Sequence, residues 1–147
     1  MSFAPPNENF EKTVRKLLLG MPYLQWLELS FVHIAPGEVD LAMPLRRDIT
    51  FDGKSVQAGP IGSLLDFAGG AAAFTLAPEH EMLATSDFTV KLIAPAVGDH
   101  FIGRGRVVAR TGATTISRAD VFAVKANAET MIATGLVSMR SLGRPAG

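Results

Sequence analysis

The chain contains no cysteine. Without a thiol it has no disulfide, no thiolate metal ligand and no cysteine nucleophile, and this composition fits a reducing compartment. An excess of either charge is also missing, because Lys+Arg and Asp+Glu both number 14. No global field therefore attracts nucleic acid or an anionic membrane surface. Any anionic ligand has to be held by a local cluster of basic side chains.

Long hydrophobic runs are absent too, and every apolar stretch is shorter than the roughly 20 residues that a membrane helix needs. Residues 1–10 lack a basic segment followed by an apolar run, so we expect no signal peptide. His33, His80 and His100 are not spaced as metal ligands. The sequence therefore predicts a cytoplasmic protein with no metal, no nucleic-acid partner and no membrane partner.

What the chain does have is apolar content. Its 147 residues are 48% hydrophobic and 19% charged, which indicates one globular domain over residues 1–147 with a sizeable core. Pro5 and Pro6 block regular structure at the start, so residues 1–7 are expected to form a flexible tail. No internal repeat and no second domain is apparent.

Apolar side chains at helical spacing predict a short helix over residues 10–18. Asn7 or Asn9 is expected to cap it, and Gly20 with Pro22 to end it.

Residues 24–43 alternate between apolar and polar side chains, with a turn signal at residues 35–37, and so predict a β-hairpin. Residues 45–59 have little periodicity and predict a loop.

A second helix is predicted over residues 60–76, where Pro60 suits the first turn and Pro78 marks the end. It is apolar on nearly every side, which is typical of a buried helix. Asp66 is its one charged residue.

Four alternating runs follow, joined by short turn-like links that predict an antiparallel meander: residues 82–94, 99–110, 114–125 and 129–141. The expected fold is α+β, a curved antiparallel sheet wrapped around one long helix, with a short N-terminal helix. Because one sheet covers only part of a helix, a second chain is expected to complete its burial.

A carboxylate within an apolar helix is costly unless it is paired, solvated or protonated. The neighbours of Asp66 one turn away are Gly62, Ser63, Gly69 and Gly70, and such small residues let a ligand or a backbone approach closely. Asp66 is thus a candidate catalytic group, and Ser63, Gly69 and Gly70 are candidate substrate contacts. The alternative is that Asp66 bonds to a nearby backbone group or Arg and only sets packing.

The turn before this helix is a candidate anion site. Backbone N–H groups at a helix N-terminus are unpaired and favour negative charge, so a substrate carbonyl placed there is stabilised as it becomes an oxyanion. Gln57 adds an amide donor, and the alternative for it is an ordinary loop side chain facing water.

The stretch from Gln57 to Gly70 resembles the signature of the phenylacetate-degradation-type (PaaI-like) acyl-CoA thioesterases of the hotdog superfamily. That signature reads His-Gly-Gly, six residues, Asp, and then small residues in a central helix. Gln57 stands in place of the His, Ala58 and Gly59 in place of Gly-Gly, and Asp66 in place of the catalytic Asp.

The likeness extends over residues 24–141, and residues 85–90 resemble the family's next strand. Thr85 matches the hydroxyl residue that positions the attacking water in related enzymes. The resemblance implies a hotdog fold and hydrolysis of an acyl-CoA thioester to free acid and CoA, with Asp66 as general base or as nucleophile. It also implies that no metal and no organic cofactor is required, since CoA is part of the substrate.

The resemblance also implies a homodimer, with possible pairing into a homotetramer, whose active sites lie between subunits. Asp66 would come from one chain, and Gln57 with Gly59 from the other. Two departures stand out: Gln57 keeps a donor where the family has His, and Pro60 removes one N–H, which leaves the N–H of Gly59 as the oxyanion donor.

Basic side chains are expected around the cleft to bind the CoA phosphates, and the main candidates are Lys91, Arg104 and Arg106. The alternative is that they form a solvated outer face of the sheet. Arg104 and Arg106 share a face because they lie two residues apart on one strand.

Two functions are alternatives to thioester hydrolysis. A non-catalytic acyl-CoA-binding module would use the same cleft and would tolerate Asp66→Asn. A hotdog dehydratase or hydratase needs a His paired with a carboxylate, and the central helix contains no His.

Overall fold

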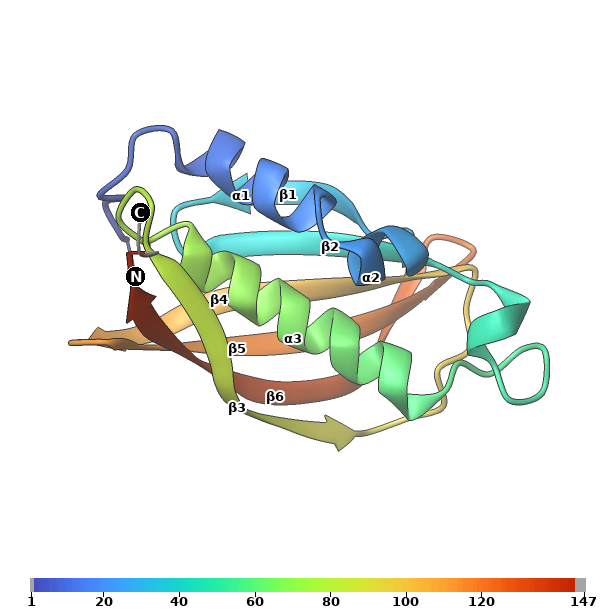
Figure 1. The fold of residues 1–147 in the computed structure, drawn as a ribbon. Helices are drawn as coiled ribbons and strands as arrows, with labels where there is room; N and C mark the ends of the chain where they lie inside the picture. Colours follow the sequence, from blue (N-terminus) through green and yellow to red (C-terminus); the bar gives the residue numbers. More distant parts are fainter. Residues whose placement is uncertain (1, 145–147) are drawn as a thin grey trace.

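A six-stranded antiparallel sheet curls around one long helix, α3, in the computed structural model, which describes residues 2–144 (Figure 1). The helices are α1 (Phe10–Leu19), α2 (Pro22–Trp26) and α3 (Ala58–Phe74), with a 3₁₀ turn at Arg47–Ile49. The strands are β1 (Ser30–Ala35), β2 (Glu38–Pro44), β3 (Met82–Leu92), β4 (His100–Thr111), β5 (Thr114–Lys125) and β6 (Ala128–Gly143). The predicted α+β fold with a central helix is confirmed.

The strand order is β1-β2-β4-β5-β6-β3. The predicted hairpin of β1 and β2 and the meander of β4, β5 and β6 are confirmed. The prediction that β3 joins the same meander is wrong, because β3 pairs with β6. The link that contains Pro95 spans residues 93–99 and crosses the end of the sheet. Along it, the N–H groups of Ile93 and Asp99 donate to the carbonyls of Ile132 and Val124.

Helix boundaries differ from expectation at two prolines. Pro22 follows the end of α1 at Leu19, as predicted, but it also opens the short helix α2, where its missing N–H leaves no bond unmade. Likewise α3 begins at Ala58, two residues before Pro60, so that Gln57 is its N-cap residue. A proline within a first helical turn is compatible with either start, which is why the sequence pattern did not fix the boundary.

The segment before α3 is an ordered loop. Thr50 and Val56 form an isolated antiparallel bridge, and Asp52 accepts hydrogen bonds from the N–H groups of Lys54 and Ser55. These bonds hold the pKa of Asp52 below its usual value. The N–H of Gln57 donates to Ile49 at 2.9 Å, which fixes the start of α3 on this loop.

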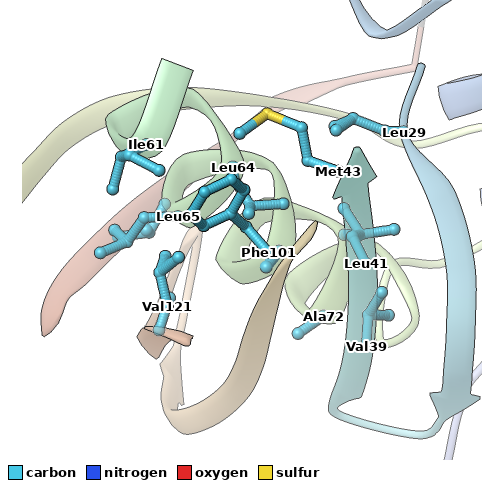
Figure 2. Packing of buried hydrophobic residues seen from close by; sticks show 14 of the residues in the cluster. Leu29, Val39, Leu41, Met43, Ile61, Leu64, Leu65, Ala72, Phe101 and Val121 are labelled. Atoms are coloured by element: carbon cyan, nitrogen blue, oxygen red, sulfur yellow. The ribbon is translucent and has the colours of Figure 1, made fainter. Parts of the chain in front are cut away.

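Glycines of β4 let α3 lie directly on the sheet. A Cβ added to Gly105 would lie 2.0 Å from the carbonyl oxygen of Ala68, and one added to Gly103 would lie 2.9 Å from the side chain of Leu64. Figure 2 shows Leu64 and Leu65 of α3 beside Phe101 in the core. Burial of each such large side chain contributes about 1.5–3 kcal/mol to stability.

The N-terminal elements cover the other side of α3 (Figure 1). Val14 and Leu18 of α1 are buried in the core. In the preceding segment, which we expected to be a flexible tail, Phe3 packs against the core and Asn7 is buried. Among the described residues, no helix is long and apolar enough to cross a membrane.

Candidate active site

Asp66 lies midway along α3, and its carboxylate meets the hydroxyl of a residue on β3. Thr85 Oγ1 donates a hydrogen bond to Asp66 Oδ1 at 2.9 Å and lies 3.2 Å from Met139 Sδ. Just after Thr85 the register of β3 against β6 shifts, because Thr85 pairs with Met139 whereas Asp87 pairs with Ser138. Ser86 is therefore the extra residue of a β-bulge, a feature that redirects side chains.

The Asp66 carboxyl is half-buried, and this burial raises its pKa above the usual value, while the hydrogen bond from Thr85 lowers it in part. Across residues 2–144 Asp66 takes part in no ion pair. A desolvated carboxylate without a cationic partner is a stronger base than an exposed one. This environment suits a general base or a nucleophile.

A cavity of about 200 Å³ opens beside Asp66. It is lined by Leu18, Met21, Asp66, Phe67, Gly70, Ala71, Phe74, Leu83, Thr85 and Met139. Asp66 and Thr85 are its polar residues, and the remaining walls are apolar. Gly70 stands one turn after Asp66 on the same face of α3, and its missing side chain leaves room for the cavity.

The small residues predicted as substrate contacts have three different surroundings. Gly70 lines the cavity, whereas Gly69 packs so closely on the sheet that an added Cβ would lie 2.7 Å from Val137. Ser63 donates to the carbonyl of Gly59 at 3.0 Å and lies 2.9 Å from the hydroxyl of Tyr23. The Ser63 hydroxyl is thus occupied by its own helix and by α2.

Gln57 and Gly59 are exposed at the N-terminus of α3, and the Gln57 side chain makes no capping bond. Nine residues separate Gln57 from Asp66. At 1.5 Å per residue they lie about 13 Å apart along the helix axis. One thioester carbonyl cannot contact both groups of a single chain, so within one chain the predicted oxyanion turn and the carboxylate do not meet.

The predicted CoA-binding arginines lie on the face of the sheet that points away from α3. Arg104 forms two hydrogen bonds with Glu129, at 2.8 and 2.7 Å, and Arg106 donates to Asp40 at 2.6 Å. Lys91 is exposed on β3 opposite Thr134. The chain therefore does not bring these three cations to Asp66, and their contact with CoA stays a prediction.

Several cavity residues were not foreseen from the sequence. Phe74 lies two turns after Asp66 on the same helical face, so the helical spacing contained a signal for it. Met21 and Leu83 come from segments whose position against α3 depends on the tertiary fold, and no local pattern could place them. Among the described residues, no cluster of three or more His, Cys, Asp or Glu is arranged to hold a metal ion.

Comparison with known structures supports the same fold. A thioesterase family protein from Silicibacter pomeroyi is 31% identical, with a TM-score of 0.88 over 91% of this chain and 98% of that one. The Escherichia coli PaaI protein from the phenylacetic acid degradation operon is 14% identical, with a TM-score of 0.81 over 92% of this chain and 95% of that one.

A third structure, S. sahachiroi AziG, is 20% identical, with a TM-score of 0.75 over 84% of this chain and 98% of that one. At such low identities the last two matches show the fold alone. No protein-family model and no curated protein matches the sequence. The Silicibacter match covers almost the whole of both chains at 31% identity. On that ground, the chain belongs to the hotdog-fold thioesterase superfamily.

Proposed function

We propose that the protein hydrolyses acyl-CoA thioesters to a free acid and CoA, with Asp66 as the reacting carboxylate. The observation that supports this most is the environment of Asp66: half-buried, bonded to Thr85 and placed at the edge of an apolar cavity. A thioesterase needs a base or nucleophile beside an acyl pocket, and this arrangement provides both.

In the general-base route, Asp66 removes a proton from a water molecule as the water oxygen attacks the thioester carbonyl. The tetrahedral intermediate then expels the CoA thiolate, and Asp66 returns the proton to sulfur. In the nucleophilic route, an Asp66 oxygen attacks the carbonyl and displaces the thiolate, and water hydrolyses the resulting anhydride. In both routes Thr85 orients the carboxylate through its 2.9 Å hydrogen bond.

The oxyanion donors in this proposal come from a second chain. Along β3, Thr85 adjoins Asp66, whereas Val90 adjoins Gly62 in the first turns of α3. We infer that a two-fold axis pairs the free edge of β3 with its own copy in antiparallel fashion, with residue 85 of one chain near residue 90 of the other. In such a homodimer Gln57 of the partner subunit would lie toward Asp66, so that the two chains share each site.

Exposed apolar side chains on β3 favour this pairing. Phe88 is 45% exposed, Leu92 56% and the following Ile93 55%, along an edge strand whose outer side has no neighbouring strand among the described residues. Such an edge is unfavourable in water unless another chain covers it. Pairing of dimers into tetramers and a cytoplasmic location stay predictions, and sedimentation of the purified protein tests the first.

The direct test measures free CoA thiol released from short aliphatic, long aliphatic and aromatic acyl-CoAs. Wild type should turn over at least one of them, and Asp66→Asn should lower kcat by about a hundredfold or more. Tight acyl-CoA binding without turnover of any thioester would instead favour the binding module.

The shared site is tested by subunit complementation. Asp66→Asn and Gln57→Ala each remove one half of every site, but a mixed dimer contains one site with both wild-type groups. Random co-assembly of equal amounts should therefore restore about a quarter of wild-type activity. A mixture no more active than its two components would overturn the two-chain site.

A further inference from the structure

A second, larger cavity adjoins the one at Asp66. It measures about 770 Å³ and lies between α1 and the segment that follows α3. Met21 and Phe74 line both cavities, so these two side chains form the wall between them. Both are partly buried and pack against the hydrophobic core.

The larger cavity has an apolar interior and charged side chains of both signs. Its apolar lining comprises Leu17, Met21, Pro22, Phe74, Ala77, Pro78 and Met82. The cations Lys12 and Lys16 are matched by the anions Glu79 and Glu81, with His80 between the latter two. Because the charges balance, this cavity does not favour the phosphates of CoA, and its lining suits a hydrocarbon.

The direction of the larger cavity from Asp66 also bears on which part of a substrate it can hold. Gly70 and Phe74 follow Asp66 toward the C-terminal end of α3, and both line the cavity at Asp66. A thioester carbonyl at Asp66 can therefore extend its acyl group along Gly70 toward Phe74. Met21 is able to yield to such a chain, because its unbranched thioether has three rotatable bonds.

We propose that the two cavities together hold the acyl group, that the preferred substrates are long-chain aliphatic acyl-CoAs, and that Met21 and Phe74 determine the accepted chain length. This inference rests on the proposed thioester hydrolysis. Short acyl groups occupy only the cavity at Asp66, and longer ones pass Met21 into the larger cavity. Each methylene that becomes buried raises kcat/KM by up to about fourfold, the equivalent of ~0.8 kcal/mol.

The test compares kcat/KM for acetyl-, butyryl-, octanoyl-, dodecanoyl-, hexadecanoyl- and phenylacetyl-CoA in wild type and Met21→Phe. Wild type should prefer dodecanoyl- over butyryl-CoA by about a hundredfold or more. The rigid ring in Met21→Phe should block the passage and lower the ratio of kcat/KM on dodecanoyl-CoA to that on butyryl-CoA at least about tenfold.

Met131→Phe is the matched control, because Met131 is also partly buried but lies on β6, outside both cavities. It should leave the chain-length profile unchanged, and thermal melting checks that both variants fold. Hydrolysis of short or aromatic thioesters alone, or an equal loss on all chains in Met21→Phe, would overturn the inference while the proposed function stands.

If no thioester is hydrolysed, the proposed function fails and the cavities are tested by binding alone. Calorimetric titration of dodecanoic acid into wild type should show binding that Met21→Phe weakens at least about tenfold. Equal binding by the two proteins, or none by wild type, would overturn the inference.

Discussion

Two carboxylates on opposite sides of the sheet have contrasting partners. Asp40 on β2 is 8% exposed and contacts two guanidinium groups, with Arg106 at 2.6 Å and Arg104 at 3.7 Å. Asp66 on the helix side is half-buried, accepts one hydrogen bond from the neutral hydroxyl of Thr85 and belongs to no ion pair formed by residues 2–144.

The contrast distinguishes a carboxylate that is paired with arginines from the carboxylate that we propose to react. The charge of Asp40 is balanced by the arginines around it, so it holds β2 against β4. The charge of Asp66 has no cationic partner among residues 2–144 and is stabilised only by the hydrogen bond from a hydroxyl. Burial raises the pKa of Asp66, and the raised pKa makes its carboxylate a stronger base. What surrounds a buried acid, more than burial itself, indicates whether it performs chemistry.

The largest expected effect comes from neutralising each acid in turn. Asp66→Asn should lower kcat about a hundredfold or more, and Asp40→Asn should change it less than about threefold. Asp40→Asn should instead lower the free energy of unfolding by about 1–2 kcal/mol, because it weakens charge-assisted hydrogen bonds. Thiol release and urea denaturation measure the two quantities. Equal activity losses in both variants would break the comparison.

A smaller effect is expected from Thr85→Val, which keeps the shape of the side chain but removes the hydrogen bond that lowers the pKa of Asp66. Asp66 must be ionised to act, so activity falls as the pH falls through its pKa. Loss of the bond raises this pKa, and the acid limb of the kcat/KM profile should move to higher pH. On that limb activity should fall about tenfold, with a smaller loss at higher pH. An unmoved acid limb would remove Thr85 from the control of Asp66.

Stability should respond to Asp66 in the opposite direction to activity. A carboxyl whose pKa is raised in the folded state binds its proton more tightly there than in the unfolded chain. Stability therefore falls as the pH rises from the unfolded to the folded pKa. Asp66→Asn removes this cost, so at neutral pH its melting temperature should exceed that of wild type, by about 2–4 °C for each kcal/mol of stability gained. In acid the two proteins should melt at the same temperature. Calorimetry over a pH series measures the difference.

The smallest effect concerns a buried polar group that, among the described residues, has neither an ionic partner like that of Asp40 nor a hydrogen-bond partner like that of Asp66. Ser117 on β5 is fully buried, and its Oγ has no hydrogen-bond partner among the described residues. Ser117→Ala removes this unsatisfied hydroxyl and should raise the free energy of unfolding by about 1 kcal/mol, with activity unchanged. Thr75, also fully buried, donates to the carbonyl of Ala72, so Thr75→Val should destabilise and serves as the contrasting variant.

Local patterns predicted the features that depend on nearby residues. The apolar spacing of α3, its single acid and the alternation of the strands were sufficient to predict a sheet around a buried helix. Likeness to a family, and not any spacing, drew attention to Thr85 as a residue that positions water. Its hydrogen bond to Asp66, 19 residues away, was not predicted.

The remaining features depend on long-range pairing. The position of β3 beside β6 and the contribution of Met21 to the cavity have no local signature. Similarly, strand alternation put Arg104 and Arg106 on one face but did not say that this face lies away from Asp66. Sheet order and the packing of α1 on α3 decide such questions, and both arise only when distant segments meet.

The backbone contact between α3 and Gly105 of β4 has a consequence for how such proteins diverge. The carbonyl of Ala68 fits where only a glycine leaves space, so the rotation and position of the helix are fixed by main-chain atoms. Substitutions in the cavity beside Asp66 can then change its size without displacing the carboxylate two residues before Ala68. For the proposed hydrolysis, the fold thus allows the range of substrates to change while the carboxylate stays in place.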